Sequence, residues 1–276
     1  MKKGTVWAIG ASSGLGLATA QAFAADGWLV VAGARSFGAP SADDPDNILR
    51  LPLDVTSAES RQAFAEKAFS YSPRVDVLIY SAAVLVLGAC ETTSHNEYER
   101  VMQTNFLGMT SMVALALPAM REQKAGKIVL FSSINGLLGI PFQSAYTASK
   151  HAVEGYAECL AVEVKPYHIQ VSLVEPGDHR GGSQHTRLHA AGEQKASPYG
   201  AAYRAACNVI HQDESNGLLP DKLGQKVLRN VNRKRMRFRQ CVAKPDQKLE
   251  VVLHCILAPS LNFLILHGYY GKGGRS

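Results

Sequence analysis

Short apolar runs alternate with longer helical patterns along most of the chain. Residues 5–9 form an apolar run typical of a buried strand, and apolar side chains recur at helical spacing over residues 17–24. A second apolar run covers residues 28–34. Two strands joined by a helix within about thirty residues predict a β-α-β unit, in which both strands run in the same direction.

Four later apolar runs predict further strands, at residues 48–53, 75–79, 127–131 and 169–174. Helical patterns separate these runs, and the longest covers residues 97–123. The chain shows no internal repeat, low-complexity tract or linker between domains. We therefore predict a single α/β domain over residues 1–276, with a doubly wound, predominantly parallel sheet of the Rossmann type and helices on both faces.

The composition is that of a globular protein with a sizeable core. The 276 residues are 46% apolar and 19% charged, and the formal net charge is +6. That mild positive charge suits an anionic cofactor as well as nucleic acid. Five cysteines lie far apart without a C-x-x-C pair, which argues against a zinc motif or a disulfide framework. We expect free thiols, a reducing compartment and no metal site.

Targeting and membrane segments are not predicted. Lys2 and Lys3 precede an apolar run that glycines and serines interrupt within a few residues, so no signal peptide is expected. The longest late apolar run, residues 261–266, is too short to span a bilayer. We therefore expect a cytoplasmic protein.

Three glycines mark the end of the first predicted strand. Gly10, Gly14 and Gly16 follow that strand directly and open the first predicted helix. Glycines at such a turn let the backbone approach a pyrophosphate, which then lies at the positive N-terminus of the helix. A glycine-rich turn alone is a weak signal, but its place within a β-α-β unit favours a dinucleotide site.

A tyrosine and a lysine form the candidate catalytic pair. Tyr146 and Lys150 are four residues apart in a predicted helix, so their side chains share one face. A phenol is a poor acid or base near neutral pH, and an adjacent ammonium group is expected to lower its pKa. Ser133, at the end of the strand over 127–131, could hydrogen-bond the same substrate oxygen. The spacing alone is more often that of an ordinary amphipathic helix, so this hypothesis depends on the other motifs.

Taken together, the motifs resemble those of the short-chain dehydrogenase/reductase (SDR) family. They occur in the family's order: the glycine turn, Asp54-Val55, Asn105, Ser133 and Tyr146-x-x-x-Lys150. The resemblance implies a cofactor-binding and catalytic core over residues 4–180. It also implies a substrate loop, a last strand and a substrate-covering C-terminal extension over residues 181–276.

The resemblance assigns roles to four catalytic residues. Tyr146 would donate the proton, Ser133 would polarise the substrate oxygen, and Lys150 would lower the pKa of Tyr146 and contact the nicotinamide ribose. Ser133 is preferred to Ser132 because the family's active serine lies thirteen residues before the tyrosine. Asn105 would bend its helix and hold a water that relays protons to Lys150; alternatively it only caps a kink.

The resemblance also implies a set of cofactor contacts. Asp54 and Val55 would bracket the adenine, although Asp54 could instead, or also, cap the following helix. The backbone N–H of His179 is expected to meet the nicotinamide carboxamide. The full expected set is Gly10, Ser12, Ser13, Gly14, Leu15, Gly16, Arg35, Asp54, Val55, Ser81, Ala82, Tyr146, Lys150, Pro176, Gly177 and His179.

The end of the second strand favours NADP(H) over NAD(H), without excluding NAD(H). An acidic residue at this place would bind the ribose diol and repel a 2′-phosphate, but the chain has Ala34 there. Arg35 follows, and its guanidinium can pair with the phosphate. Arginine at this place is similar to the NADP-preferring members of the family.

Two segments depart from the family's pattern. Residues 80–83 read Tyr-Ser-Ala-Ala where the family usually has Asn-Asn-Ala-Gly, a change that we interpret as tuning rather than loss of the cofactor site. Gly181 replaces a threonine that contacts the carboxamide. His151 neighbours Lys150 but points off the catalytic face, so a structural role is expected for it.

The last third of the chain combines an irregular segment, a basic stretch and helical patterns. Residues 181–217 read as polar and irregular, similar to the family's variable substrate-binding loop and helix, whereas residues 220–231 predict a helix. The basic stretch 233–239 predicts a turn into an edge strand over 238–243 rather than a nucleic-acid site. Helical segments over 249–266 are expected to cover the substrate cleft. This outline resembles the 17β-hydroxysteroid dehydrogenase type 1-like and retinol dehydrogenase-like branch.

We therefore predict an NADP(H)-dependent oxidoreductase that reversibly reduces a ketone or aldehyde to an alcohol. Its partners would be a small carbonyl or alcohol substrate and further copies of the chain, as a dimer or tetramer, with no nucleic acid and no membrane span. Two alternatives stay open. One is an epimerase or dehydratase acting on nucleotide sugars, and the other is a regulatory protein that binds the dinucleotide without turnover.

Overall fold

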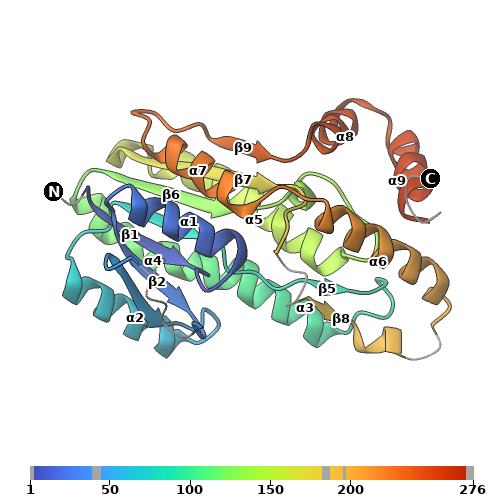
Figure 1. Cartoon of the computed structure of the whole chain (residues 1–276), viewed down its shortest axis with the longest axis horizontal. Helices are drawn as coiled ribbons and strands as arrows, with labels where there is room; N and C mark the ends of the chain where they lie inside the picture. Colours follow the sequence, from blue (N-terminus) through green and yellow to red (C-terminus); the bar gives the residue numbers. More distant parts are fainter. Residues whose placement is uncertain (1–2, 39–44, 182–186, 195–196, 272–276) are drawn as a thin grey trace.

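The computed structural model describes residues 3–38, 45–181, 187–194 and 197–271. Within these residues, seven parallel strands form the central sheet in the order β3-β2-β1-β4-β6-β7-β9 (Figure 1). The strands are β1 (Thr5–Ile9), β2 (Leu29–Ala34), β3 (Ile48–Pro52), β4 (Val77–Tyr80), β6 (Gly126–Phe131), β7 (Ile169–Pro176) and β9 (Arg239–Val242). The strand order reverses between β1 and β4, so the predicted doubly wound sheet is confirmed.

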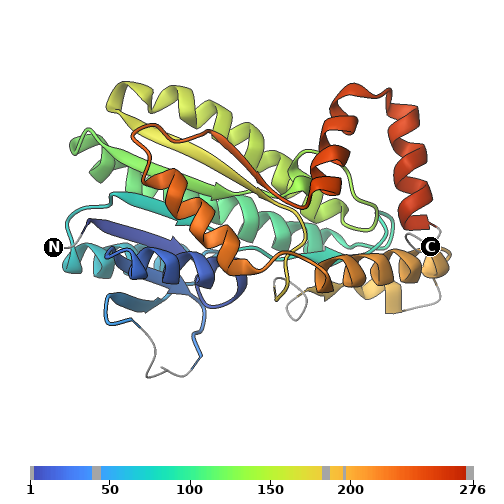
Figure 2. The same cartoon turned by 45° about the horizontal axis from the view of Figure 1, so that its top comes forward.

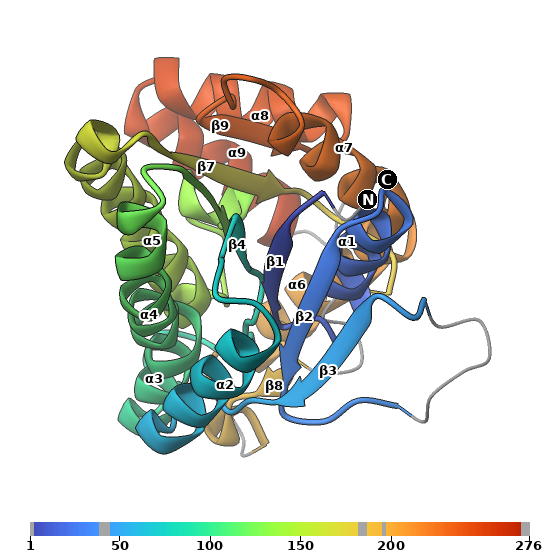
Figure 3. The same ribbon diagram turned by 90° about the vertical axis from the view of Figure 1, so that its left-hand side faces the viewer.

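Helices cover both faces of this sheet (Figure 3). On one face lie α1 (Gly14–Ala25) and α7 (Pro220–Val231), and on the other lie α2 (Ala58–Tyr71), α4 (Gly108–Glu122) and α5 (Ser144–Glu163). Successive side chains of a strand point to opposite faces, so Val6 packs toward α1 and α7 whereas Trp7 packs toward α2 and α4. Burial on both faces explains why the strands read as continuous apolar runs.

Local capping fixes where the helices begin. Ser57 caps α2, because its Oγ accepts a hydrogen bond from the backbone N–H of Ser60 at 3.1 Å. Oδ1 of Asp54 instead accepts hydrogen bonds from the backbone N–H and the hydroxyl of Thr56, at 2.9 and 2.7 Å. The alternative that Asp54 caps the following helix is therefore wrong.

The predicted long helix over 97–123 is divided by a π-helical turn. α3 (His95–Met102) passes into the π-helix Gln103–Leu107, and α4 follows it. Asn105 lies in this turn, so the expected local distortion of the helix is confirmed. Single π-helical turns inside α-helices are often found at functional sites.

The basic stretch leads into the edge strand β9, as predicted. Arg239 lies among three carboxylates: it contacts Glu154 at 2.5 Å and Glu158 and Glu175 at 2.7 Å each. These ion pairs join β9 to α5 and β7, so Arg239, the last cation of the stretch, has a structural role.

The pattern over 181–217 reads as irregular, whereas the resemblance implies a loop and a helix there, and the structure has a helix in the second half. α6 (Gly200–Ser215) is a regular helix because Tyr203, Ala206 and Ile210 recur at helical spacing and are buried. Shorter elements complete the region: β5 (Val86–Leu87) pairs with β8 (Leu188–His189), and 3₁₀ turns cover Ile134–Gly136, Lys165–Tyr167 and Ala191–Gln194. Residues 182–186 and 195–196 lie outside the described residues.

Two helices form the end of the described chain, α8 (Pro245–Ile256) and α9 (Pro259–Gly271). Figure 2 shows them as a hairpin that projects from the body of the molecule, with α9 near α6. No helix in the described part of the chain has the length and apolar character needed to cross a membrane.

Candidate active site

A cavity of about 660 Å³ lies along the carboxyl ends of the strands. Its wall comes from the loops after β1, β4, β6 and β7 and from the hairpin of α8 and α9. Every catalytic or cofactor residue predicted from the sequence lines this cavity, with the exception of Asn105. Open α/β sheets place their ligands at this edge, beside the point where the strand order reverses.

The glycine turn forms one end of the cavity. Gly10 and Gly14 have φ angles of +87° and +53°, which side chains with a Cβ rarely adopt. A Cβ on Gly16 would lie 2.2 Å from the carbonyl oxygen of Gly10 and 2.5 Å from Oγ of Ser81. Glycine at position 16 therefore lets α1 begin close to the ends of β1 and β4, and all three glycines line the cavity at the N-terminus of α1. These residues fit the pyrophosphate of a dinucleotide.

Arg35 and Asp54 lie at the same end of the cavity. Arg35 is exposed at the end of β2, next to the buried Ala34. Hydrogen bonds from Thr56 lower the pKa of Asp54, and the positive charges of Arg35 and Arg61 lower it further. Asp54 is therefore ionised at neutral pH, and Arg35 places a guanidinium at this end of the cavity.

The atypical turn over residues 80–83 keeps its connection to the glycine turn. Both the backbone N–H and the hydroxyl of Ser81 donate to the carbonyl oxygen of Ile9, at 2.8 Å each. A Cβ on Gly10 would lie 2.4 Å from the backbone nitrogen of Ala82, so the two turns are in close contact. Ser81 thus supplies a side-chain hydrogen bond that joins the ends of β4 and β1.

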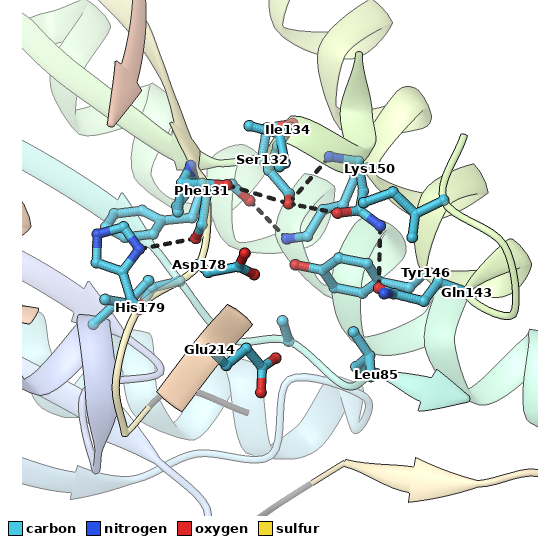
Figure 4. A pocket seen from close by; sticks show the side chains of 18 of the residues that line it. Leu85, Phe131, Ser132, Ile134, Gln143, Tyr146, Lys150, Asp178, His179 and Glu214 are labelled. Atoms are coloured by element: carbon cyan, nitrogen blue, oxygen red, sulfur yellow. Dashed lines mark hydrogen bonds between the residues drawn. The ribbon is translucent and has the colours of Figure 1, made fainter. Parts of the chain in front are cut away.

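Tyr146 and Lys150 project from α5 into the middle of the cavity (Figure 4). Nζ of Lys150 donates to the carbonyl oxygen of Phe131 at 2.7 Å and lies 5.4 Å from the centroid of the Tyr146 ring. Burial lowers the pKa of Lys150 to about 8, and the negative charge of Glu154 opposes this change. Lys150 therefore remains mostly a cation at neutral pH.

The sequence predicted that Lys150 lowers the pKa of Tyr146, and in the protein without bound cofactor or substrate this prediction is wrong. Burial raises this pKa to about 12, while a hydrogen bond with Ser133 lowers it and the negative charge of Glu214 raises it further. Loss of hydration outweighs the neighbouring donors, because a buried phenolate has few groups to replace water. Tyr146 is consequently a protonated phenol throughout the neutral range, the form that can donate a proton.

Ser133 lies beside Tyr146, at the carboxyl end of β6. Its Oγ accepts a hydrogen bond from the backbone N–H of Asn135 at 3.2 Å, and it lies 3.4 Å from the carbonyl oxygen of Pro176. Ser132 also lines the cavity, but only Ser133 hydrogen-bonds Tyr146. Among the residues that the structure describes, the geometry thus agrees with the preference for Ser133.

Asn105 does not line the cavity but hydrogen-bonds residues of two neighbouring segments, the loop after β4 and helix α5. Its side chain accepts from the backbone N–H of Val84 at 2.7 Å and donates to the carbonyl oxygen of Val84 at 3.0 Å and to Ser149 at 2.9 Å. It therefore joins the loop after β4 to the residue that precedes Lys150. The proton relay through a water at Asn105 stays a prediction.

The loop after β7 forms the wall opposite the glycine turn. Pro176, Gly177 and His179 line the cavity as expected, and Gly181 has a φ of +66°. Burial lowers the pKa of His179, whose Nδ1 lies 2.9 Å from the carbonyl oxygen of Gly177. Within the described residues, Nε2 of this buried ring has no hydrogen-bond partner. An unpaired polar atom in the wall fits a site that a polar ligand completes.

His151 is exposed, as expected, and its Nδ1 lies 3.0 Å from the carbonyl oxygen of Thr147.

Two acidic side chains beside Tyr146 were not predicted from the sequence. Burial and the negative charges of Asp213 and Glu214 raise the pKa of Asp178 to about 7. Gln247 of α8 donates to Oδ2 of Asp178 at 2.5 Å, and Arg187 forms an ion pair with Glu214. The position of Asp178 directly after Pro176-Gly177 was a signal for it. Glu214 was missed because the pattern over 181–217 reads as irregular, so the bounds of the helix that carries it were not predicted.

Another part of the wall carries apolar side chains, and more than half of them come from the C-terminal helices: Leu85, Leu138, Ile140, Leu249, Leu253, Ile265 and Leu266. The same two helices also place polar side chains on the cavity, namely Asp246, Gln247, Glu250, His254 and Asn262. The C-terminal helices thus contribute to the cavity, while the expectation that they cover a bound substrate stays a prediction.

Comparison with known proteins identifies relatives that match most of the chain. The family model for short chain dehydrogenases matches residues 4–190. A 3-ketodihydrosphingosine reductase from Bacteroides thetaiotaomicron is 39% identical over 240 residues, which cover 87% of this chain and 88% of the relative. The predicted hydroxysteroid and retinol dehydrogenase branch is not decided by these matches.

Solved structures show the same fold. A short-chain dehydrogenase from Streptomyces avermitilis superposes with a TM-score of 0.83 and 29% identity, covering 96% of each chain. A short chain dehydrogenase/reductase from Burkholderia phymatum, solved in complex with NAD, gives a TM-score of 0.77 and 25% identity, covering 91% of this chain and 92% of the other.

Proposed function

Because the chain belongs to the short-chain dehydrogenase family, we propose that it reduces a ketone or aldehyde to an alcohol with NADPH. The observation that carries this proposal is the meeting of Ser133, Tyr146 and Lys150 in one cavity with the glycine turn. NADPH, when bound, would supply the hydride. The glycine turn, Arg35 and Asp54 would hold its phosphates, ribose and adenine.

The side chains of the cavity supply the proton and orient the substrate. Tyr146 is a protonated phenol, so it can donate its proton to a substrate oxygen as negative charge develops there. Ser133 donates a hydrogen bond to the same oxygen and holds it in place. The cation of Lys150, fixed by Phe131, stabilises the phenolate that Tyr146 becomes.

We infer that the substrate is a ketone with a long apolar chain. The apolar wall formed by α8, α9 and residues such as Leu138 and Ile140 suits a hydrocarbon chain. The relative from Bacteroides thetaiotaomicron is named for the reduction of such a ketone. Consumption of NADPH against a panel of long-chain ketones, steroids, retinoids and quinones tests this choice. A clear preference for steroids or retinoids would contradict it.

Replacing Arg35 with aspartate is expected to shift the cofactor preference toward NADH. The change removes the partner of the 2′-phosphate and places a like charge beside it. The ratio of kcat/KM for NADPH to kcat/KM for NADH should fall by about tenfold to hundredfold, the usual worth of a charge-assisted hydrogen bond.

Arg229→Asp provides the matched control for this experiment. Arg229 lies on α7 and does not line the cavity, yet the substitution makes the same change in charge. Its cofactor ratio should remain that of the wild type. An equal ratio for wild type and Arg35→Asp would show that another residue selects the phosphate.

Ketone reduction is expected to fall as the pH rises past about 8. Burial lowers the pKa of Lys150 to this value, so the working cation is present below it and lost above it. The pH dependence of kcat/KM for NADPH reports ionisations of the free enzyme. It therefore measures this decrease of the rate above about pH 8, which we call the alkaline limb of the profile.

Substitutions of two glutamates on α5 test whether the alkaline limb is due to Lys150. The charge of the buried Glu154 raises the Lys150 pKa, so Glu154→Gln should move the limb to lower pH. Glu158→Gln removes another partner of Arg239 and should leave the limb in place. A limb that stays fixed in Glu154→Gln would mean that a group other than Lys150 titrates.

The alternatives make different predictions about turnover. A regulatory protein would bind NADPH without oxidising it in the presence of any ketone. An epimerase or dehydratase would return the hydride within its own cycle and leave NADPH unconsumed. Steady consumption of NADPH with equal formation of alcohol favours the reductase.

A further inference from the structure

The hairpin of α8 and α9 exposes an apolar surface, here called the hairpin patch. Its members are Leu249, Val252 and Ile256 of α8 and Leu261, Phe263, Leu264 and Ile265 of α9. Ile256, Leu264 and Phe263 are 71%, 66% and 65% exposed. Apolar side chains gathered on one surface usually mark a site of interaction with a protein or a membrane.

The other side of the hairpin is fixed to the body of the molecule. Leu266 and Tyr270 are buried against α6, and Tyr269 donates a hydrogen bond to Asp213 of α6 at 2.7 Å. The buried Asn262 donates to the carbonyl oxygens of His254 and Leu257, at 3.1 and 3.3 Å, and so joins α9 to the end of α8. Defined contacts therefore fix the hairpin to α6, and Figure 2 shows that its two helices project from the body of the molecule.

The hairpin patch continues into the substrate cavity. Leu249 and Ile265 line the cavity, yet they are 57% and 42% exposed, so they lie at its rim. Leu253 and Leu266 extend the apolar lining inward from these two residues. An apolar molecule can thus contact hydrocarbon side chains both at the rim and further inside the cavity, next to polar lining residues of the same helices such as Glu250 and His254.

We propose that the hairpin patch docks on the surface of a lipid bilayer and receives an apolar ketone directly from it. This inference rests on the proposed function, because it concerns how the same cavity obtains its substrate. The hairpin would lie at the boundary between headgroups and acyl chains, with Ile256, Phe263 and Leu264 inserted. The ketone would enter past Leu249 and Ile265 without crossing water.

The position of the rim favours a bilayer over a second copy of the chain. A protein chain packed on the hairpin patch would cover the mouth of the cavity, whereas a bilayer covers it and supplies the ligand at the same place. α9 contains no charged residue from Pro259 to Gly271, which lowers the cost of contact with acyl chains. The net charge of +6 adds a long-range attraction to anionic lipid.

Flotation of the full chain with lipid vesicles tests the proposal. Vesicles of phosphatidylcholine, alone and mixed with phosphatidylserine, should carry the wild type to the top of the gradient. The double variant Ile256→Asp, Phe263→Asp should bind both kinds of vesicle about tenfold or more weakly, since two inserted apolar groups become charged. Tyr71→Asp, an exposed aromatic residue on α2, should bind as the wild type does.

Activity measurements separate this inference from the proposed function. With a short, water-soluble ketone, the double variant should retain the wild-type rate, because neither altered residue lines the cavity. With a long-chain ketone embedded in vesicles, its rate should fall by about tenfold or more, in proportion to binding.

Two outcomes would overturn the inference while leaving the reductase intact. One is a wild type that reduces the soluble ketone but does not float with either vesicle. The other is a wild-type oligomer that the double variant converts to a monomer, which would identify a second copy as the occupant of the hairpin patch. Failure of the wild type to reduce any ketone would instead reject the proposed function.

Discussion

Replacing Tyr146 with phenylalanine is expected to lower kcat/KM for ketone reduction by about 10²-fold to 10⁴-fold, the usual contribution of a positioned general acid. The substitution removes one hydroxyl and keeps the buried ring in contact with Lys150. NADPH affinity should therefore change little. Steady-state rates and the binding of NADPH, followed by its fluorescence, measure the two effects separately.

The high pKa of Tyr146 makes this test direct. At about 12, the phenol is protonated at every pH used for the assay, so its own titration does not contribute to the rate. A variant that keeps more than about a tenth of the wild-type rate would show that water or another side chain delivers the proton. A variant that no longer binds NADPH would show that the tyrosine supports the cofactor rather than the chemistry.

Replacing Ser133 with alanine should lower kcat by about 10²-fold to 10³-fold, as the loss of a donor to a developing oxyanion does in other enzymes. The hydroxyl lies in a buried position, where its hydrogen bond is not weakened by water. The pKa of Tyr146 should rise further, because the hydrogen bond from Ser133 lowers it in the wild type.

Ser132→Ala is the matched control for Ser133→Ala. The two serines are adjacent and both are buried, but Ser132 is not placed to hydrogen-bond Tyr146. We expect Ser132→Ala to keep kcat within about threefold of the wild type, since it removes no group that meets the oxyanion. Equal losses in both variants would indicate a packing defect at the end of β6, and a larger loss in Ser132→Ala would reverse the assignment.

Most of the sheet and its helices could be predicted because the strands are buried on both faces. The segments at residues 5–9 and 127–131 each contain four consecutive apolar residues and fall close to β1 and β6. Pro220 marks the beginning of α7 and the helical pattern ends with Val231, so this helix was predicted with its observed bounds.

Other features depend on tertiary contacts that no local pattern contains. α6 begins after a polar segment. One of its faces is buried by residues distant in the sequence, including those of α9. The expected effect of Lys150 on the Tyr146 pKa considered one neighbour, whereas burial by the whole cavity determines the sign. The approach of Glu214 to Asp178 joins α6 to the loop after β7, and spacing along the chain could not show it.

The catalytic residues and the apolar entrance are linked by one structural unit. α6 contributes Glu214 near Tyr146 and also holds α9 through Asp213. In the proposed function, the substrate would enter at one end of the cavity wall and receive its proton at the other. This arrangement suits a ketone whose polar end reacts while its chain remains among the C-terminal helices.

Transfer of deuterium from NADPH to the product tests the central claim most directly. The wild type is incubated with NADPH that carries two deuterium atoms at C4 of the nicotinamide, together with a ketone found in the panel, and the alcohol is analysed by mass spectrometry. We predict one deuterium at the carbinol carbon for each NADPH consumed. Oxidation of NADPH without deuterium in the alcohol, or no alcohol from any ketone of the panel, would contradict the account.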